Sequence, residues 1–319
     1  MITVTKPLSS PSPPLTQGVS MSDPKISLHP PKKILLGTDL SARGDRALDR
    51  AAQLARQWDA ELLVVHALDR KAEHVSDLVD PLPSWRQSPS QELHIQKQIR
   101  RDLREEVAQL KIHIEEGDPA QVILDTAARE GCELIVLGMA RDELFGRTLL
   151  GSTVEYLLRK SPVSVLVVKT RPNGSYQHVL VGTDFTEESR WGLEVAAHSF
   201  PSARLTLMHS FEMPYRALLS DSTLSHQFAA MERATIAEFV RDTALPEQVR
   251  ARLQTTIEHG PPGLMLRRFV EEQHSDLTVI GAYGRGFLFH LFVGGNTPRI
   301  VDSVPGDILL VRAHREKAG

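Results

Sequence analysis

The chain carries the same pattern twice, and this long repeat limits the folds that are open to it. The matching segments are KILLGTDLS at 33–41 with HVLVGTDFT at 178–186, and LLVVHAL at 62–68 with LTLMHSF at 205–211. Asp39 and Asp184 lie 145 positions apart, and Gly138 and Gly281, which each follow an apolar run, lie 143 apart. Solenoid repeats are about 20 to 50 residues long, so a period of this length indicates a duplicated domain.

Length and local composition divide the chain in the same way. At roughly 100 to 200 residues per domain, 319 residues are enough for two domains, each with its own core. The predicted segments are a disordered Pro/Ser-rich tail at 1–31, a first domain at 32–170, a linker at 171–175, a second domain at 176–314 and a tail at 315–319. We predict disorder in the first tail because it shows no hydrophobic periodicity.

Bulk charge and cysteine content exclude several classes of partner and compartment. A formal net charge of −3 and a pI near 6.5 give no basic surface for nucleic acid or for an anionic membrane. Cys132 is the one cysteine of the sequence, so no internal disulfide can form. No apolar run approaches the roughly 18 to 20 residues of a membrane span. We therefore expect a cytoplasmic protein with no nucleic-acid and no membrane partner.

Strand-like and helix-like segments alternate within each half. Ile34–Leu36 and Val179–Val181 are continuous apolar runs, which fit parallel strands that are buried on both faces. Asp118 followed by Pro119 predicts a helix start with an Asp cap and Pro in the first turn. We predict an α/β fold of two tandem doubly wound domains, each a five-stranded parallel sheet in the order 3-2-1-4-5 with helices on both faces.

An Asp after the first strand and a glycine-rich segment after the fourth form a recognisable pattern. The glycine segment follows Gly-x2-Gly-x9-Gly-[Ser/Thr], with departures in each half, and EEGDPAQVILDTA and CELIVLG accompany it in the first half. The chain resembles the universal stress protein family in its tandem two-domain form. The resemblance implies an adenine nucleotide, ATP with or without Mg2+, as ligand. It also implies that the fifth strands, Val163–Val168 and Ile308–Val311, pair the two halves into a pseudo-dimer.

The resemblance assigns nucleotide contacts by position in each half. The strand-one Asp and a backbone group at the end of strand two would hold adenosine, and the glycine segment would hold phosphates. In the first half these positions are Asp39, Ala67, Gly138, Gly151 and Ser152, and in the second half they are Asp184, Ser210, Gly281, Gly284 and Gly294. Glycine suits such a segment because its backbone N–H can approach a phosphate oxygen closely.

The two halves depart from the pattern in different ways. In the first half, Arg141 replaces the second glycine and could either clamp a phosphate or fill its space. In the second half, Gly284 is kept, whereas Gly295 replaces the hydroxyl residue. The retained glycine pair favours the second half as the binding half and leaves the first half open.

Several of these residues also have purely structural interpretations. Asp39 and Asp184 could cap the next helix instead of binding a ligand, with Ser41 and Thr186 as competing caps. Ser152 and Glu155 form a Ser-x-x-Glu capping box, which needs no ligand. We predict structural roles for His66 and His209, because no second ligand residue stands at metal-binding spacing beside either. We likewise predict that Cys132 is a small buried residue.

No catalytic motif accompanies the glycine segments. The sequence lacks a Gly-Lys-[Ser/Thr] phosphate loop, a Gly-x-Ser-x-Gly elbow and a His-x-x-x-His helix. A phosphate site with no lysine, metal carboxylate or base would leave ATP hydrolysis at most slow. We therefore predict an ATP-binding stress-response sensor or regulator, not an enzyme, with an unidentified regulatory protein partner and with a homo-oligomer left open.

Two alternatives from other functional classes remain at this stage. One is a nucleotide-free interaction module, which Arg141, Gly295 and the apolar run FLFHLF at 287–292 favour. The other is a slow ATPase or an AMP-transferring enzyme of a related α/β fold. Nucleotide binding to the purified protein separates the first alternative from the rest, and turnover above a trace rate would support the second.

Overall fold

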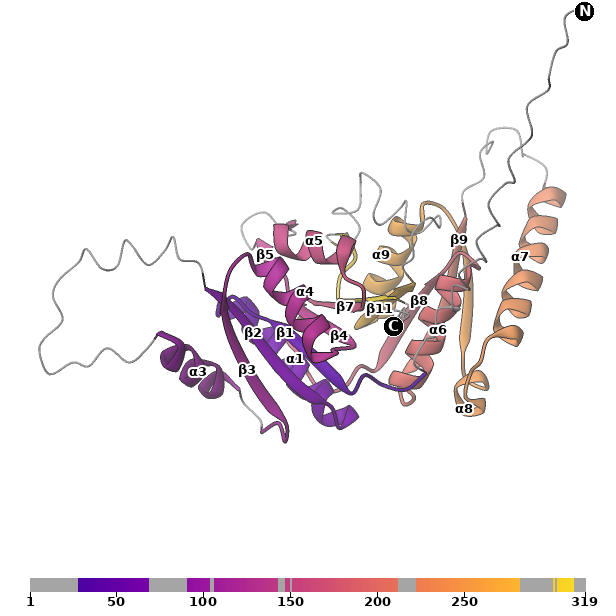
Figure 1. The fold of residues 1–319 in the computed structure, drawn as a ribbon. Helices are drawn as coiled ribbons and strands as arrows, with labels where there is room; N and C mark the ends of the chain where they lie inside the picture. Colours follow the sequence, from indigo (N-terminus) through magenta and orange to yellow (C-terminus); the bar gives the residue numbers. More distant parts are fainter. Residues whose placement is uncertain are drawn as a thin grey trace, which may run out of the picture.

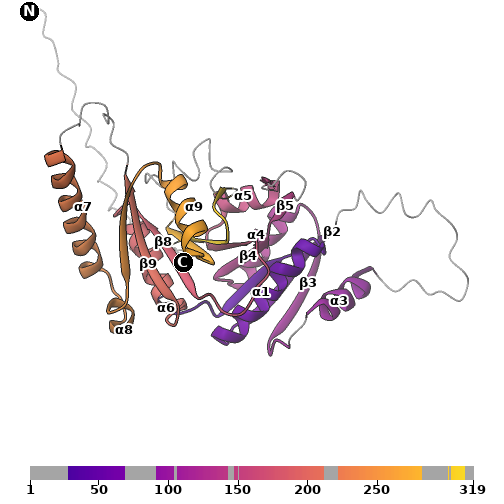
Figure 2. The same ribbon diagram turned by 180° about the vertical axis from the view of Figure 1, so that it is seen from behind.

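A ten-stranded sheet runs through the part of the chain that the structure describes (Figure 1). The structure is a computed structural model. It describes residues 28–68, 91–103, 106–142, 147–149, 151–211, 222–281, 301 and 303–312. Helices cover both faces of the sheet, as the sequence predicts for an α/β fold (Figures 1 and 2).

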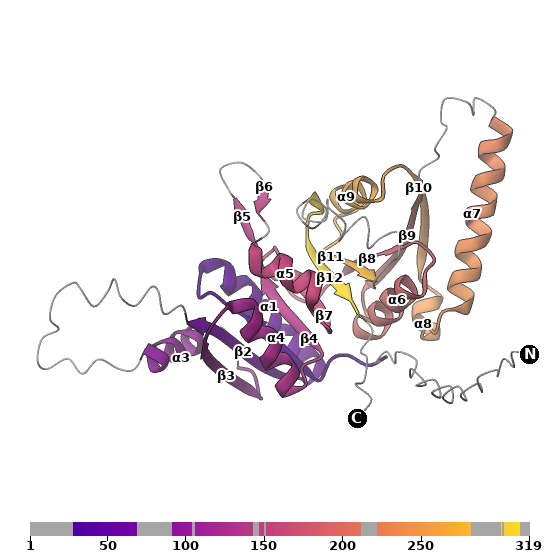
Figure 3. The same cartoon turned by 45° about the horizontal axis from the view of Figure 1, so that its top comes forward.

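The first half supplies five strands of this sheet and a separate small hairpin. Its elements are β1 (Lys33–Gly37), α1 (Ala42–Trp58), β2 (Glu61–Leu68), α3 (Gln91–Asp102), β3 (Leu110–Glu116), α4 (Pro119–Glu130), β4 (Leu134–Gly138), β5 (Ala140–Asp142), β6 (Arg147–Leu149), α5 (Ser152–Lys160) and β7 (Ser164–Val168). The hairpin is the antiparallel pair β5–β6, which stands beside α5 (Figure 3). The sequence analysis did not predict it.

The second half repeats this order of strands and helices. Its elements are β8 (His178–Thr183), α6 (Glu187–Ser199), β9 (Arg204–Phe211), α7 (Ser222–Asp242), α8 (Glu247–Arg250), β10 (Gln254–His259), α9 (Pro262–Gln273), β11 (Leu277–Gly281) and β12 (Asp307–Val311). The apolar run at 287–292 lies outside the described residues.

The order of the strands confirms the predicted doubly wound topology in both halves. The sheet reads β10-β9-β8-β11-β12-β7-β4-β1-β2-β3, so each half has the order 3-2-1-4-5. In the ten-stranded sheet, all pairings within a half are parallel. Ile34, Leu35 and Leu36 are each 0% exposed, as expected for a strand covered on both faces.

Two apolar layers cover the sheet, one on each face. Buried residues of α1, α3, α6 and α7 pack on one face, and those of α4, α5 and α9 pack on the other. The layer with α4 and α5 lies over the sheet in Figure 1, and α1 comes forward in the view from behind (Figure 2). The start of α4 is as predicted, because Asp118 accepts from the Gln121 amide at 3.0 Å and Pro119 is the first helical residue.

The two halves meet where β7 and β12 pair. This pairing is antiparallel, with Leu166 opposite Leu309 and Val165 opposite Leu310, whereas every other pairing in the sheet is parallel. An antiparallel contact between equivalent strands relates the halves by an approximate two-fold axis. The pseudo-dimer expected from the resemblance is therefore present within this one chain.

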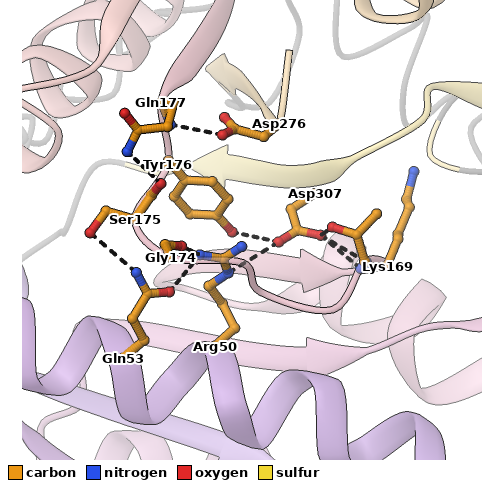
Figure 4. A network of polar contacts seen from close by, with 10 residues as sticks. Arg50, Gln53, Lys169, Gly174, Ser175, Tyr176, Gln177, Asp276 and Asp307 are labelled. Carbon is orange, nitrogen blue, oxygen red and sulfur yellow. Dashed lines mark hydrogen bonds and ion pairs between the residues drawn. The ribbon is translucent and has the colours of Figure 1, made fainter. Parts of the chain in front are cut away.

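A buried polar network fixes the chain as it passes from one half to the other (Figure 4). The Asp307 carboxylate, which is 0% exposed, accepts from the Lys169 amide at 2.9 Å, from the Thr170 amide and hydroxyl at 3.1 Å each, and from the Tyr176 hydroxyl at 2.6 Å. Arg50 of α1 lies 3.4 Å from the same carboxylate, and its guanidinium stacks 3.9 Å from the centre of the Tyr176 ring. Asp307 thereby ties α1 and the residues on either side of the linker to β12 of the second half.

Removing the Asp307 carboxylate should destabilise the whole chain. Asp307→Ala leaves the buried Arg50 guanidinium without its counter-ion, which typically costs about 3 to 5 kcal/mol of unfolding free energy. Ser164 occupies the equivalent position in β7 and accepts one hydrogen bond, from the Arg312 amide at 3.1 Å. We therefore expect Ser164→Ala to cost only about 1 kcal/mol in urea unfolding. Equal losses in the two variants would contradict the central role of Asp307.

Tyr176 should make part of the stability dependent on alkaline pH. Burial, and then the negative charge of Asp307, hold the pKa of the Tyr176 hydroxyl well above its ordinary value of 10.0. The unfolded chain loses this proton above about pH 10 while the folded chain keeps it, so this stabilisation is present below pH 10 and declines as the pH rises. In Tyr176→Phe the fall of unfolding free energy above pH 10 should be shallower, by at most about 1.4 kcal/mol per pH unit. Parallel slopes in the two proteins would rule out this contribution.

Candidate functional site

A cavity of about 320 Å3 lies at the carboxyl ends of the first-half strands. Its lining residues come from the ends of β1, β2 and β4 and from the first turns of α1, α4 and α5. They are Gly37, Thr38, Asp39, Gly44, Val65, His66, Ala67, Pro119, Ile123, Leu137, Gly138, Met139, Gly151, Thr153 and Val154. Ligands of doubly wound sheets bind at this edge, which makes the cavity the candidate site. Asp39, Ala67, Gly138 and Gly151 were predicted from the sequence, whereas the apolar residues of the wall were not.

Asp39 stands at the mouth of the cavity and is exposed. Its Oδ1 atom accepts from the Ser41 amide at 3.0 Å and from the Ser41 hydroxyl at 2.5 Å. Ser41 is the cap of α1, because its side chain accepts from the Gly44 amide. The choice between cap and ligand is thus settled in part, since Ser41 caps the helix. The Oδ2 atom of Asp39 has no partner within the described residues.

The first turn of α5 forms another part of the cavity wall. Gly151 is the N-cap residue, in an extended conformation, and forms no side-chain cap hydrogen bond. The predicted capping box is wrong, because Ser152 is already helical and the Glu155 carboxylate bonds Arg159 at 2.6 Å instead. Ser152 is exposed and does not line the cavity. The wall at Gly151 consequently presents a helix N-terminus that no side chain caps.

In the glycine segment of the first half, the described residues 140–142 and 147–149 pair as the hairpin β5–β6. Arg141 lies in β5, and its backbone pairs with Thr148 of β6. Gly138 ends β4, and Ala67 lies near the end of β2; both line the cavity. The segment shows no alternation of apolar and polar residues that would have predicted the hairpin. Arg141 is therefore placed by its backbone on the strand that leads away from Gly138.

At the corresponding edge of the second half, the side chains of Asp184 and Ser210 form hydrogen bonds within the protein. Asp184 accepts from the Thr186 amide at 3.2 Å and from its hydroxyl at 2.5 Å, and Thr186 caps α6, as Ser41 caps α1. The Ser210 hydroxyl donates to the Gly260 carbonyl at 2.6 Å. Gly284, Gly294 and Gly295 lie outside the described residues.

Gly281 has a structural reason for being glycine. A Cβ atom built on it would lie 1.8 Å from the Glu188 carbonyl oxygen and 2.7 Å from the Ser189 amide nitrogen. The first turn of α6 therefore packs directly on the end of β11, which only glycine permits. The resemblance assigns the same glycine to phosphate binding, and both packing and phosphate binding require a residue without Cβ.

Equivalent positions of the two halves differ consistently in burial. Thr38, Ala67 and Gly138 are partly exposed, whereas their second-half counterparts Thr183, Ser210 and Gly281 are buried. Where the first half has Gly44 in its cavity wall, the second half has Ser189, which is 0% exposed and lies 2.9 Å from the Thr183 hydroxyl. The strand ends are thus open in the first half and covered in the second.

The two histidines have matching structural contacts. His66 Nδ1 lies 2.9 Å from the Thr38 carbonyl oxygen, and His209 Nδ1 lies 2.9 Å from that of Thr183. Because a carbonyl can only accept, each Nδ1 donates and fixes the residue that follows the first strand. Both histidines therefore hold the strand edge in place, as predicted.

Cys132 is buried, and burial raises the pKa of its thiol to about 11. Such a thiol is protonated at neutral pH and unreactive, which fits the predicted packing role.

Within the described ranges, no group of three or more His, Cys, Asp or Glu side chains is placed to hold a metal ion. A search of the same residues finds no helix that is both long and apolar enough to cross a bilayer.

Both halves of the chain match a known protein family. The model of the universal stress protein family matches residues 30–169 and, a second time, residues 175–312. The chain belongs to the universal stress protein family and carries two of its domains in tandem.

Curated relatives and solved structures agree with this membership. Stress response protein NhaX of Bacillus subtilis is 30% identical over 161 residues, which are 43% of this chain and 97% of NhaX. A functionally unknown protein from Pseudomonas aeruginosa matches 90% of this chain and 94% of its own, at 20% identity and a TM-score of 0.61. A universal stress protein from Archaeoglobus fulgidus matches 88% and 98%, at 19% identity and a TM-score of 0.60. At this identity the two structures show the fold alone.

A universal stress protein solved in complex with cAMP is also similar, over 44% of this chain and 98% of its own. Its identity is 22% and its TM-score is 0.31.

Because the first turn of α6 packs directly on Gly281 at the end of β11, Gly281→Ala should destabilise the protein even without ligand. The added methyl group would overlap the backbone of α6, so we expect a loss of at least about 2 kcal/mol in unfolding free energy. Gly151→Ala is the matched control, because a Cβ there meets nothing within 4 Å. That control should cost about 1 kcal/mol or less, as for Ala at an N-cap. Thermal or urea unfolding measures both, and a Gly281→Ala protein as stable as the wild type would refute the packing explanation.

Proposed function

We propose that this protein binds an adenine nucleotide, ATP with or without Mg2+, in the first-half cavity and acts in the cytoplasm as a stress-response sensor or regulator. One observation carries the proposal. A single cavity combines the free Oδ2 of Asp39, an apolar wall and the uncapped first turn of α5. These three parts match the three parts of a nucleotide: sugar, base and phosphates.

The apolar wall suits the flat face of a base. Val65, Ile123, Leu137 and Val154 line the cavity and are nearly inaccessible to solvent. Sites for small ligands are typically apolar cavities of about 300 Å3 or more with a few polar groups that fix orientation. The cavity of about 320 Å3 falls at the lower end of that range. Its open mouth leaves the phosphates room outside the enclosed space.

The two polar parts of the site differ in charge: the Asp39 carboxylate is negative, and the α5 N-terminus carries partial positive charge. The Asp39 carboxylate accepts hydrogen bonds, which suits the hydroxyl or amino groups of a nucleoside. The α5 N-terminus at Gly151 offers backbone N–H groups and partial positive charge, which suit phosphate. A ligand with donors at one end and anionic groups at the other satisfies both.

The first half is the better candidate, although its glycine pattern is the less complete. The strand ends of the second half are buried, and Gly281 is used by α6 for packing. These features favour a nucleotide-free role for the second half, as a structural or protein-binding partner of the first. We thus propose the nucleotide-free interaction module for the second half only, and nucleotide binding for the first half.

We propose binding without efficient turnover. Hydrolysis of ATP requires that the developing charge be neutralised and the attacking water held in line. Among the described residues, the cavity wall contains one carboxylate, Asp39, and no lysine or arginine. An unidentified protein partner would then read whether the nucleotide is bound.

Asp39→Asn should weaken ATP binding to the full-length protein by about tenfold, since a bond to a charged acceptor contributes about 1.5 kcal/mol or more. Asparagine keeps the oxygen that Ser41 bonds and alters only the other atom of the carboxylate. Asp184→Asn makes the same change in the second half and should leave affinity unaltered. Isothermal titration with ATP, AMP, cAMP and adenosine measures these affinities.

Four outcomes would count against the proposal. Equal weakening in both variants would mean that the first half is not the sole site, and weakening in Asp184→Asn alone would place the nucleotide in the second half. Failure of the wild-type protein to bind any of the four ligands leaves the nucleotide-free alternative. Release of phosphate from ATP above a trace rate would favour the ATPase alternative.

A further inference from the structure

The last turn of α5 contains a carbonyl that its own helix cannot satisfy. The Leu158 carbonyl would ordinarily accept from the amide four residues later, but that residue is Pro162, which has no N–H. The Leu157 carbonyl, by contrast, accepts from the Ser161 amide at 2.9 Å. Arg312 of the second half supplies the missing donor, through Nη2 at 2.5 Å from the Leu158 oxygen.

The same arrangement occurs in the other direction across the pseudo-dimer. The Val301 carbonyl faces the same loss, because the residue four positions on is Pro305. Lys169 of the first half donates to it, and also to the Val304 carbonyl at 2.6 Å. Each half thus donates to a carbonyl of the other that stands four positions before a proline, with a cation directly after its fifth strand. We call these two contacts the reciprocal caps.

Arg312 is held firmly in this contact. Its amide donates to the Ser164 hydroxyl at 3.1 Å, next to the β7–β12 pairing. Burial lowers the pKa of its guanidinium, and its Nε atom has no hydrogen-bond partner in the described part of the chain. Burying a cation with an unpaired nitrogen is unfavourable. The bond to Leu158 is therefore the main compensation that the structure offers for placing Arg312 there.

The opposite end of α5 lines the candidate cavity, where we propose that the phosphates bind. The helix has nine residues and is about 13 Å long, with Val154, Leu157 and Leu158 buried along it. Because the helix is short and rigid, a contact that fixes its carboxyl end also fixes the position and direction of its amino end. A cation at the carboxyl end and an anion at the amino end both stabilise the helix dipole.

We propose that Arg312 is a positioning residue through which the second half aims the α5 N-terminus at the phosphates of a nucleotide bound in the first half. The inference rests on the proposed function, and it names the ligand group concerned. Arg312 acts more on phosphate than on nucleoside, because α5 and its N-cap meet the cavity at Gly151 and Thr153 and contribute one residue, Val154, to the apolar wall. The site of one domain is then complete only with the other domain in place.

The test compares ATP with adenosine on the full-length protein by isothermal titration. In Arg312→Met the cap is lost, so we expect ATP affinity to fall by about tenfold, the size of one lost bond to a charged group. Adenosine affinity should stay within twofold, which also reports that the protein is folded. Arg312→Lys should retain ATP affinity, because lysine makes the equivalent contact at Lys169. If Arg312→Met does not fold, Arg312→Gln, which is shorter and uncharged, takes its place with the same expectation.

Lys169→Met is the matched control, since it removes the bonds to the Val301 and Val304 carbonyls of the second half and should leave the ratio of ATP to adenosine affinity unchanged. Equal loss of ATP and adenosine in Arg312→Met would mean a general structural role and overturn the inference. An unchanged ratio in Arg312→Met, or the same change in Lys169→Met, would overturn it as well. If the wild-type protein binds neither ligand, both the proposed function and this inference are wrong. If the wild-type protein binds both ligands and Arg312→Met leaves the ratio of ATP to adenosine affinity unchanged, only the inference is wrong.

Discussion

The antiparallel pairing of β7 with β12 is the contact on which the rest of the molecule depends. Without it, each half would end in a fifth strand whose unpaired backbone groups face solvent, which is a known route to aggregation. The pairing joins the two sheets into one and leaves β3 and β10 as the outer strands. Because both strands belong to one chain, the contact forms at any protein concentration. The Asp307 network and the reciprocal caps are arranged around this pairing.

Duplication has kept the fold in both halves while the strand edges have diverged. Ser41 and Thr186 cap equivalent helices, and Asp39 and Asp184 hold these caps with the same geometry. The edge is nevertheless open in the first half and covered in the second, where α6 packs on Gly281. A duplicated domain can divide its tasks in this way, since one copy suffices for ligand binding and the other can specialise in support.

The fold was predictable from the sequence because its determinants are local and repeated. Continuous apolar runs such as Ile34–Leu36 and the Asp118 cap define strands and helix starts without reference to distant residues. The site was predictable only in part. A glycine needed by a phosphate and a glycine needed by a packed helix, as at Gly281, are identical in sequence. The bond from Arg312 to Leu158 joins residues 154 positions apart, so only the three-dimensional arrangement reveals it.

The central claim is that one nucleotide binds per chain, between the Asp39 carboxylate and the α5 N-terminus. A crystal structure of the full-length protein grown with ATP tests it most directly. We expect the nucleotide in the first-half cavity, with its base against Val65 and Ile123 and its phosphates at the amides that follow Gly151. A nucleotide at the strand ends of the second half, near Asp184, with the first-half cavity empty, would contradict the account.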